Sequence, residues 1–433
     1  MKKRYMLLGL LVVLLAVALT AMACGGEEVT TTTAAPSTDT TAAPSTDTTA
    51  APSTDTTAAT GPATGEPIKL GLSNSLTGAG AAPGDSVSKG VALQVEWVNE
   101  NGGINGRPLE VMEYDDKTEV PNLVANLTKL IQEDKVFGII GPFIQFGQEA
   151  ARAVTEQAQI PHVGMGPATL DQIAGTKYTW SVMMSAAPPT QADALAKVFK
   201  ANGWKNVLAI ADILAIHQET LDLLVKAGPT EGFTLTKMPD TFGFDVTDFQ
   251  PILNRIMEEY KKLKPDAVVL YVNPLAVPPL FKGLRALGVT EPIQGSPAGA
   301  HPAIFMMGPD AVEGFYVLDS GGIVNPQGLP DDWPLKAMQV DFVQRYTQKY
   351  GSPPDFFSAA GADLIGVMAE ALKQAGGADD KEKVRQALIN LDDLKTLEGI
   401  MSWTPDDTNQ GVRGSMVEFQ VKGAVFQYVD AVN

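Results

Sequence analysis

The residues that could carry chemistry in this chain are few and scattered. Its three histidines, His162, His217 and His301, have no near-neighbour spacing of the zinc-ligand type. Ser86-Val-Ser-Lys89 has the Ser-x-x-Lys order of penicillin-interacting enzymes. No Lys-Thr-Gly sequence follows it, so we interpret it as a chance match on a helix face. The sequence therefore predicts a protein without catalysis, without a metal site and without a cofactor.

A glycine-rich segment from Gly78 to Gly84 lies between a predicted strand and a predicted helix, as a dinucleotide fingerprint would. Its last glycine comes one residue late, and Pro83 interrupts the pattern. A loop that lines a ligand cleft has the same need for close backbone approach. We therefore favour a cleft loop over a nucleotide site.

The stretch GIIGPFIQFG, residues 138–147, places two rings and an amide in a loop directly after a buried strand. Gln145 could cap the following helix, and Phe143 or Phe146 could fill the core of the domain. A loop that follows Gly-Pro at the end of a strand is poorly placed for core filling. We therefore expect at least one of the two rings to face a ligand.

The N-terminus has the features of an export signal. Lys2, Lys3 and Arg4 precede an apolar run and a small-residue cleavage site. Residues 1–23 are therefore predicted to be a signal peptide. Cys24, the only cysteine of the chain, stands where a bacterial lipoprotein carries its lipid, although a stray cysteine after an ordinary cleavage site is the alternative.

Residues 24–66 are predicted to be a disordered tether between the lipid anchor and the folded part. The octapeptide AAPSTDTT occurs three times in a row from residue 34 to residue 57, and nothing in it could form a core. A glycosylated or adhesive stalk is the alternative interpretation.

The charge of the chain is strongly acidic. Without the three basic residues of the signal, 29 of the 32 Lys and Arg residues remain against 50 Asp and Glu residues. The resulting net charge of −21 excludes nucleic acid as a natural partner and disfavours charge-driven binding to an anionic membrane.

From residue 68 onward, buried apolar runs alternate with amphipathic segments, which predicts parallel sheets covered by helices. The first series has strands at 68–72, 109–114, 136–140 and 161–164, and helices at 85–100, 121–132 and 148–157. The second series has strands at 206–211, 234–238 and 267–272, and helices at 190–202, 218–226, 248–263 and 275–287. The remaining elements are helices at 333–350, 359–374 and 381–391 and strands at 416–420 and 425–430.

The segment 76–116 carries a resemblance to a known family, above all in NENGGINGRPLEV at 99–111 and YDD at 114–116. Further similar stretches are IIGP at 139–142, PDAVVLY at 265–271 and GADLIGVMAEAL at 361–372. The chain from residue 67 to residue 433 resembles the leucine/isoleucine/valine-type solute-binding proteins of ABC transporters. The resemblance implies an α/β protein of the type I periplasmic binding fold, with two doubly wound parallel-sheet lobes joined by a three-crossover hinge. The first lobe would hold residues 67–187 and about 320–380, and the second 188–319 and 381–433.

Loops at the carboxyl ends of the strands are the expected ligand site, because ligands of open parallel sheets bind there. Matching the family's ligand residues to this sequence by position implies Gln145, Ala168 or Thr169, and Ile216, with His217 in place of the family's glycine. At these positions the chain departs from the amino-acid-binding pattern. The ligand-binding residues expected from the loops and the resemblance are Phe143, Gln145, Phe146, Gly166, Thr169, Ile216, His217 and Asn273.

Two alternatives qualify this set. Thr169 could be the N-cap of a short helix, and His301 could cap a helix or face solvent. The second-lobe loops offer Asp212 as their only acid, so donor groups dominate. We therefore expect a small aromatic or aliphatic carboxylate, with an amino acid or an amide as the alternative.

The resemblance implies an extracytoplasmic, lipid-anchored receptor that delivers its solute to the permease and ATPase of an ABC importer. The alternative is a sensor lipoprotein that signals through a membrane partner. We expect a monomer.

Overall fold

The computed structural model of the chain describes residues 61–143, 147–166, 168–174, 178–243 and 246–432. The predicted signal peptide, Cys24 and most of the tether lie outside these residues, as do Gln145 and Phe146. Within the described part, no helix is long and apolar enough to cross a membrane.

The last residues before position 67 are bonded to the folded part. The N–H of Ala63 donates to the carbonyl of Asn99 at 2.9 Å, and the N–H groups of Thr64 and Gly65 donate to the carbonyl of Gly106 at 3.1 and 2.9 Å. The ordered domain thus includes residues that the sequence assigned to the tether.

The first sheet is entirely parallel, and its inner strands are nearly continuous runs of buried residues. Leu70, Ile140 and Val163 are completely buried, because helices cover both faces of the sheet. In spatial order its strands are β2 (Leu109–Asp115), β1 (Ile68–Asn74), β3 (Gly138–Ile140), β4 (His162–Gly164) and β5 (Ser181–Met183).

Two glycines allow close packing of the helix pair on one face of this sheet. A Cβ at Gly90 of α1 (Ala81–Glu100) would lie 1.9 Å from the carbonyl oxygen of Ser358, and one at Gly361 of α10 (Phe356–Gln374) would lie 2.4 Å from that of Val87. The other face packs against α2 (Val120–Gln132) and α3 (Gln148–Ala158), through a core cluster that includes Leu123, Leu127, Ala151 and Ile139.

The second sheet is mixed, and its central strands alternate between two cores. Val207 and Ala209 join the cluster that holds residues of α5 (Pro188–Asn202) and α6 (Ala215–Glu231), while Leu208 and Ile210 join the cluster with residues of α7 (Gln250–Leu263) and α8 (Val277–Ala286). Its strands, in spatial order, are β14 (Val425–Val432), β13 (Met416–Lys422), β10 (Tyr316–Ser320), β9 (Ile293–Gly295), β8 (Ala267–Tyr271), β6 (Asn206–Ala211) and β7 (Thr234–Lys237). The pairs β10–β13 and β13–β14 are antiparallel, and the other described pairs of this sheet are parallel.

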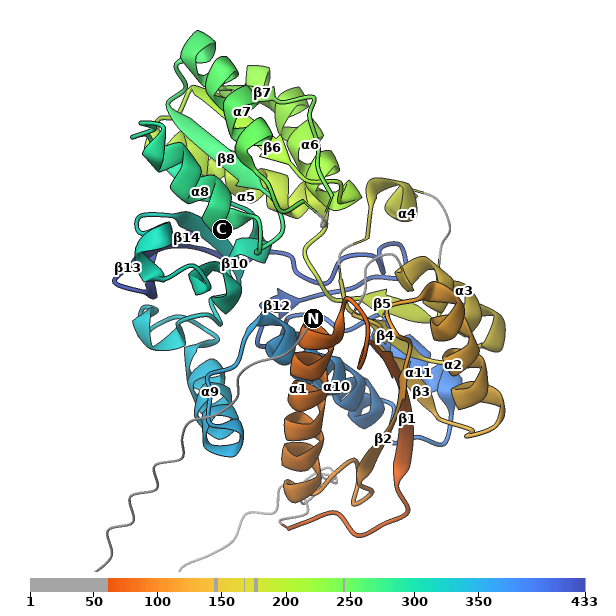
Figure 1. Ribbon diagram of the computed structural model, residues 1–433. Coiled ribbons are helices and arrows are strands. Elements are labelled where there is room, and N and C mark those ends of the chain that lie inside the picture. The colour runs from red at the N-terminus through yellow and green to blue at the C-terminus, as the bar shows by residue number, and fades with distance from the viewer. Residues whose placement is uncertain (1–60, 144–146, 167, 175–177, 244–245, 433) are drawn as a thin grey trace, which may run out of the picture. The chain divides into compact units, whose positions relative to one another are not determined.

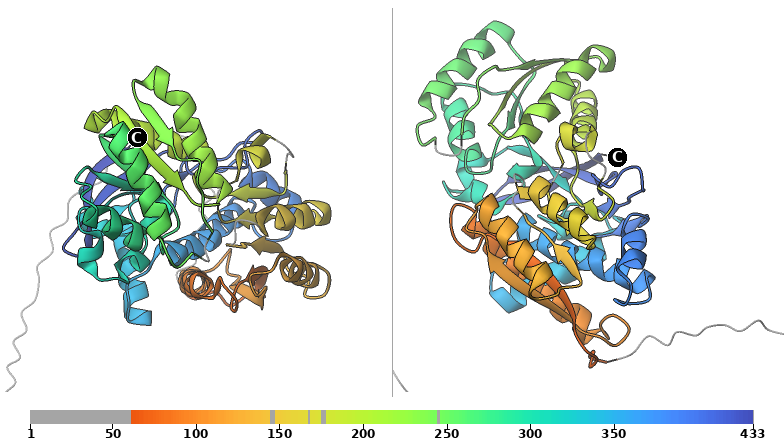
Figure 2. Two further views of the ribbon diagram at one scale, coloured as in Figure 1. Left: turned by 45° about the horizontal axis from the view of Figure 1, so that its top comes forward. Right: turned by 90° about the vertical axis from the view of Figure 1, so that its right-hand side faces the viewer.

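The chain passes between the two sheets after β5, again after β10, and a last time between α11 and β13. Figure 1 shows the two sheets with their helices as two halves, and Figure 2 shows the C-terminal part of the chain, in blue, running through both. Further elements are α9 (Lys336–Tyr350), α11 (Lys381–Leu388), β11 (Leu394–Lys395) and β12 (Ile400–Met401). This is the predicted fold of two doubly wound lobes.

Some predicted boundaries need correction. Strands β5, β9 and β10 are missing from the sequence prediction, because three to five buried residues give no periodic signal. Helix α11 was placed in the second lobe. It packs against the core that holds α10, and its Arg385 Nη1 donates to the carbonyl of Thr179 at 3.1 Å. It therefore belongs to the first lobe.

Candidate functional site

The loop after β1 is held by Asp115, which ends the neighbouring strand β2. Asp115 accepts from the backbone N–H groups of Leu76 and Thr77 at 3.0 and 3.1 Å and from the Thr77 hydroxyl at 2.6 Å. Burial would raise the pKa of Asp115, but these hydrogen bonds lower it below its ordinary value. A Cβ at Gly84 would lie 2.0 Å from the carbonyl oxygen of Ser75. Gly84 therefore allows the start of α1 to pack closely against the loop after β1.

The loop after β3 begins with Gly141 and a cis peptide bond to Pro142. His162 Nε2 lies 2.6 Å from the carbonyl oxygen of Gly141, and Gln148 Nε2 donates to that of Pro142 at 2.6 Å. Burial lowers the pKa of His162 to about 4, so this histidine is a neutral structural group. Phe143 is half-buried and directly precedes the undescribed residues 144–146.

The loop after β4 holds Gly166 and Thr169. Gly166 has φ of 99°, and its N–H donates to the Ser185 hydroxyl at 3.1 Å. Thr169 and Gln172 bond each other reciprocally, with the Thr169 N–H donating to Oε1 of Gln172 at 2.8 Å and the Gln172 N–H donating to Oγ1 of Thr169 at 3.3 Å. Thr169 thus caps the short helix α4 (Leu170–Ala174), the alternative that the sequence left open.

In the second lobe, Asp212 at the end of β6 is buried and fully engaged. Its Oδ1 accepts from the Leu214 N–H at 3.1 Å and lies 2.7 Å from His217 Nδ1. Its Oδ2 accepts from the backbone N–H of Asn273 at 2.7 Å and from Nδ2 of Asn273 at 3.4 Å. Burial would raise the pKa of Asp212, but the bonds from His217, Leu214 and Asn273 lower it. This carboxylate is therefore an ionised organiser of two loops, with no oxygen left for an incoming ammonium.

The other second-lobe candidates are constrained by the same network. His217 is 2% exposed and packs edge-on against Tyr271 at 5.1 Å between ring centroids. Since its Nδ1 serves Asp212, only Nε2 could meet a ligand. Asn273 uses Oδ1 to accept from the N–H groups of Leu275 and Ala276.

Exposed apolar side chains stand beside these polar networks, and sequence analysis missed them. Leu76 of the loop after β1 is 41% exposed, Ile213 of the loop after β6 is 54% exposed, and Leu275 of the loop after β8 is 62% exposed. Ile216, by contrast, is almost buried. An apolar residue just past a strand-end Asp or Asn is the signal that could have found them.

A third group joins the two lobes. His301, in the loop after β9, has its Nε2 3.7 Å from Oδ2 of Asp355, the N-cap of α10. The Phe357 ring packs edge-on against both His301, at 5.6 Å, and Phe143, at 5.8 Å. The Leu170 N–H also donates to Oε2 of Glu219 on α6 at 2.8 Å. Aromatic surface and a polar contact between His301 and Asp355 thus meet where loops of both lobes converge.

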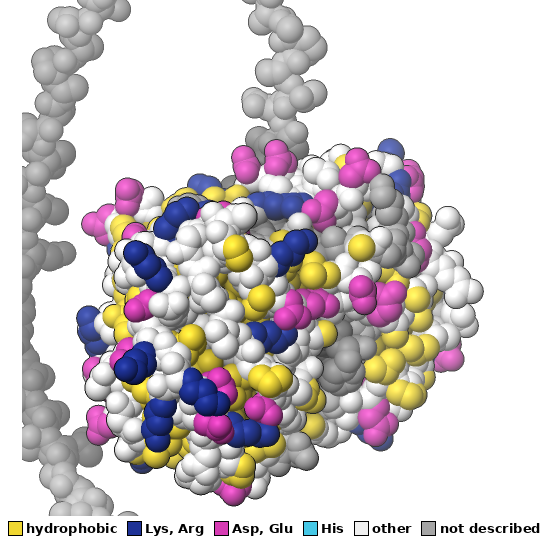
Figure 3. Space-filling model, turned by 90° about the horizontal axis from the view of Figure 1, so that it is seen from above, with side chains coloured by type: hydrophobic (Ala, Val, Ile, Leu, Met, Phe, Trp, Pro, Cys, Tyr) yellow, Lys and Arg dark blue, Asp and Glu magenta, His cyan; other side chains and the backbone are white. Residues whose placement is uncertain are grey.

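The enzyme-like motif has a structural role. Ser86 Oγ donates to Asp355 at 2.8 Å, and Lys89 pairs with Asp85 at 2.6 Å, so the serine and the lysine have different partners. Among the described residues there is no group of three or more His, Cys, Asp or Glu side chains that could hold a metal ion. Figure 3 shows that basic and acidic side chains are interspersed over the face seen from above, so this face has no single-sign patch for a polyanion.

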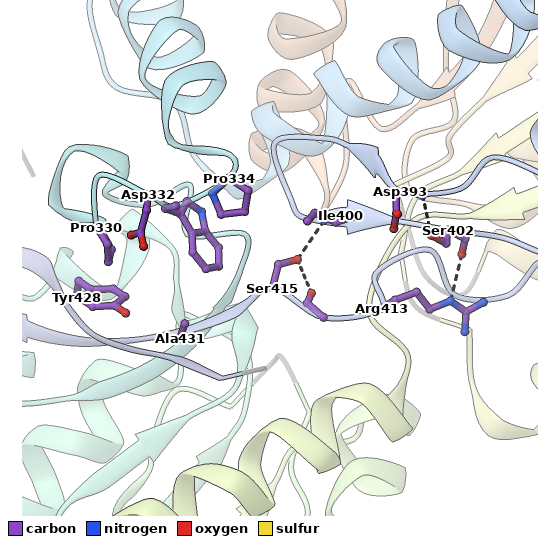
Figure 4. Close-up of a pocket in the computed structure, with 12 residues that line it drawn as sticks. Pro330, Asp332, Pro334, Asp393, Ile400, Ser402, Arg413, Ser415, Tyr428 and Ala431 are labelled. Atoms are coloured by element: carbon purple, nitrogen blue, oxygen red, sulfur yellow. Dashed lines mark hydrogen bonds between the residues drawn. The ribbon is translucent and has the colours of Figure 1, made fainter.

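A cavity of about 740 Å³ lies away from these loops. Figure 4 shows its walls: Pro330 and Pro334 of the loop before α9, Tyr428 of β14, and the connecting residues Ile400, Arg413 and Ser415. None of the predicted ligand residues lines it. Because it opens among the connecting segments and not at the carboxyl ends of the parallel strands, we assign the candidate site to the strand-end loops.

Two α/β lobes whose strand-end loops converge define a protein that binds a small molecule between them. The chain belongs to the periplasmic binding protein family, whose sequence profile matches residues 67–424. This family consists of extracytoplasmic solute-binding proteins, and the chain is a binding protein and not an enzyme.

Individual relatives agree with this assignment. The chain is 26% identical over 388 residues to the Leu/Ile/Val-binding protein homolog 7 of Brucella abortus, covering 83% of this chain and 90% of that protein. It is 22% identical to the Leu/Ile/Val-binding protein of Escherichia coli, covering 83% and 93%. An extracellular ligand-binding receptor from Rhodopseudomonas palustris shares the fold, with a TM-score of 0.72 and 23% identity over 84% of this chain and 99% of that one. So does the leucine-binding protein LivK from Thermotoga maritima, with a TM-score of 0.70 and 21% identity over 84% and 99%. The resemblance inferred from the sequence is thereby confirmed.

Proposed function

We propose that this protein captures a small carboxylate with an apolar body between its lobes and delivers it to an ABC importer. The observation that carries the ligand class is the state of Asp212, whose oxygens are occupied by His217, Leu214 and Asn273. A zwitterionic amino acid would need a free acid for its ammonium, because an unpaired charge in a closed cleft costs several kcal/mol.

Other acids at the strand ends are occupied in the same way. Asp115 serves the loop after β1, and Asp116 accepts from the Ser75 hydroxyl at 2.6 Å and the Thr118 N–H at 2.9 Å. The apolar half of the proposed ligand is supported by the exposed Leu76, Ile213 and Leu275 and by the half-buried Phe143. Gln145, Phe146 and Nε2 of His217 remain proposed contacts for the carboxylate and the apolar body.

The competing ligand class comes from the names of the relatives. The proteins of Brucella abortus and Escherichia coli are named for leucine, isoleucine and valine. Identities of 22–26% leave room for a changed specificity. A matched pair of compounds separates the two classes, because 4-methylpentanoate has the carboxylate and the branched body of leucine but no ammonium.

The test is isothermal titration calorimetry of residues 61–433 with leucine, 4-methylpentanoate, phenylacetate and 4-methylpentanamide. We expect one of the carboxylates to bind at least about tenfold more tightly than leucine, a difference of ~1.4 kcal/mol. Ile213→Asn should weaken that binding by about tenfold, whereas Val225→Asn, at the similarly exposed Val225 on α6, should leave it unchanged. Tighter binding of leucine than of both acids would refute the ligand class.

We further propose that Cys24 carries the lipid and that residues 24–66 act as the tether. In the expressing cell, Cys24→Ser should move the protein from the membrane fraction to the soluble fraction without changing ligand affinity. If the processed Cys24→Ser protein stays in the membrane fraction, the anchor is wrong.

Transport and sensing differ in their genetics. For a transport receptor we expect permease and ATPase genes beside this one and loss of labelled solute uptake on deletion. Unchanged uptake together with a lost transcriptional response to the solute would favour a sensor.

A further inference from the structure

Three rings form a continuous chain of contacts from the first lobe to the second. Phe143 follows β3, Phe357 lies in the first turn of α10, and His301 belongs to the loop after β9 of the second sheet. Phe357 packs edge-on against Phe143, at 5.8 Å between ring centroids, and against His301, at 5.6 Å. Phe357 is therefore the ring through which Phe143 is connected with the second lobe.

The backbone that carries Phe357 is fixed to the first lobe. Asp355 and Ser358 cap the helix reciprocally, with the Ser358 N–H donating to Oδ1 of Asp355 and the Asp355 N–H donating to Oγ of Ser358, both at 2.8 Å. From α1, the Ser86 hydroxyl donates to Oδ2 of Asp355 at 2.8 Å, and Gly90 packs closely against the carbonyl of Ser358. Phe357 therefore moves only together with the first lobe.

Phe143 is enclosed by other parts of the first lobe. A Cβ at Gly80 would lie 3.0 Å from Cζ of Phe143, so the ring tip reaches the loop after β1 at a place where a larger residue would crowd it. The carbonyl of Pro142, directly before Phe143, accepts from Nε2 of Gln148 at 2.6 Å. The ring thus has the loop after β1 on one side and Phe357 on another.

The ring of His301 is held by its own loop. Its Nδ1 accepts from the Ala303 N–H at 3.0 Å, so the side chain caps the 3₁₀ turn Pro302–Phe305. The distance of 3.7 Å from Nε2 to Oδ2 of Asp355 is too long for a hydrogen bond. Ring packing on Phe357, and not a hydrogen bond to Asp355, therefore connects His301 with the first lobe.

We propose that Phe357 is a positioning residue that couples the ring of Phe143 to closure of the lobes through His301. The proposal rests on the proposed capture of a solute between the lobes, with Phe143 facing that solute. When the lobes separate, Phe357 loses His301, and the ring that supports Phe143 loses its contact on that side. A solute that binds Phe143 favours the closed state to the extent that its contact is better while Phe357 is engaged.

The distance between the lobes tests this coupling without a solute. The full chain with Cys24→Ser would carry spin labels at Ala125→Cys on α2 and Lys226→Cys on α6, both exposed helix positions. Double electron–electron resonance gives the ratio of closed to open molecules. Phe357→Leu keeps an apolar side chain but removes the ring that packs on His301. We expect the ratio to fall about three- to tenfold, the range that an aromatic pair contributes.

Three further variants separate this contact from a general loss of packing. Phe357→Tyr keeps the ring and should leave the ratio within about twofold of the wild type. Phe249→Leu makes the leucine change at a half-buried ring that packs edge-on against Phe242 at 5.6 Å inside the second lobe, and should leave the ratio unchanged. His301→Gln should lower the ratio as Phe357→Leu does. The two substitutions together should lower it no further, because both remove the same contact.

The part played by Phe143 is measured with Phe143→Leu, which leaves Phe357 and His301 in place. It should lower the ratio by about twofold or more when Phe357 is present but have no effect in Phe357→Leu. An unchanged ratio in Phe357→Leu, a wild-type distance distribution without a closed population, or equal effects of Phe143→Leu in both backgrounds overturns the proposal. Because the measurement needs no solute, failure of every compound in the calorimetric panel would refute the ligand class and not this coupling.

Discussion

On the two sides where the lobes meet, the pKa values of the carboxyl groups are shifted in opposite directions. On the cleft side, Asp355 and Asp212 receive enough hydrogen bonds to lower the pKa of each carboxyl. On the hinge side, burial raises the pKa of Asp319 and of Asp363 to about 7. Burial and the two neighbouring aspartates raise the pKa of Glu398 well above its ordinary value.

The geometry of the hinge cluster explains the contrast. Asp363 of α10 accepts from the N–H groups of Leu397 and Glu398 at 2.9 Å each, and Asp319 lies in β10 of the second sheet. Three carboxyl groups from α10, β10 and the turn between β11 and β12 thus influence one another without a described cationic partner. Burial and the repulsion between like charges both disfavour the charged form, so the pKa values of these carboxyl groups rise.

The difference assigns separate roles to the two sides. A polar contact that is partly in water, like that of His301 with Asp355, contributes only about 0–1 kcal/mol, so the cleft can open at little cost. A buried cluster of carboxyls with raised pKa values lies between the crossing segments and has no such freedom. Substitutions on each side test whether the hinge is fixed and the cleft opens easily.

The largest effect is expected for Asp363→Ala on the hinge side. It leaves the N–H groups of Leu397 and Glu398 buried without an acceptor, each costing ~1–3 kcal/mol. We expect a loss of about 3 kcal/mol in the free energy of unfolding, measured by denaturant titration. Asp379→Ala, at a side chain that is 92% exposed, should change it by less than ~0.5 kcal/mol. If the two substitutions changed the free energy of unfolding equally, the hinge cluster would have no special role in stability.

The second prediction concerns the buried acid of the cleft side. Asp212→Asn keeps one acceptor oxygen but turns an amide group toward a donor, which should cost about 2 kcal/mol. The native pKa of Asp212 is lowered, so its contribution is present above the unfolded pKa and is lost as pH falls through the folded pKa. The stability deficit of the variant should therefore be full near neutral pH and shrink below about pH 4. Asp222→Asn, at a side chain that is 64% exposed, is the control.

Glu398→Gln tests the opposite pH dependence on the hinge side. A carboxyl with a raised native pKa binds its proton more tightly in the folded protein, so stability falls as pH rises from the unfolded value of about 4 through the folded value. Asp319 and Asp363, whose pKa values are about 7, extend this loss into the neutral range. The variant should lose less stability than the wild type between pH 5 and pH 9, because it lacks the carboxyl whose proton is bound more tightly in the folded protein. Thermal unfolding of both proteins across this pH range measures the difference. Equal losses of stability in the two proteins would contradict a raised pKa of Glu398.

Sequence patterns predicted the fold better than they predicted the site. The strands at 68–72, 206–211 and 267–272 carry long apolar runs, and the structure has strands there. The stretch YVLDS of β10 carries no long apolar run. Its partner β13 lies roughly a hundred residues later in the chain. Local pattern cannot show a pairing whose partner is that distant.

The site shows the same limit. Thr169 could be recognised as a cap from its neighbours, and Asp212 could be placed at a strand end. That the oxygens of Asp212 are occupied depends on Asn273, which is 61 residues away. The pairing of His301 with Asp355 depends on the docking of a loop of one lobe onto a helix of the other. Such contacts follow from tertiary packing, and no spacing rule encodes them.

The smallest effect is expected at the second cleft contact, where Glu219 accepts from the Leu170 N–H at 2.8 Å. Burial raises the pKa of Glu219, the Leu170 N–H lowers it, and Asp171 and Asp222 raise it further. Glu219→Gln keeps an acceptor oxygen for Leu170 and removes the charge that Asp171 and Asp222 oppose. The free energy of unfolding should therefore change by less than about 0.5 kcal/mol at pH 7. A loss of stability as large as that of Asp363→Ala would mean that the cleft contacts stabilise the protein as strongly as the hinge cluster does. The inferred difference between the two sides would then be wrong.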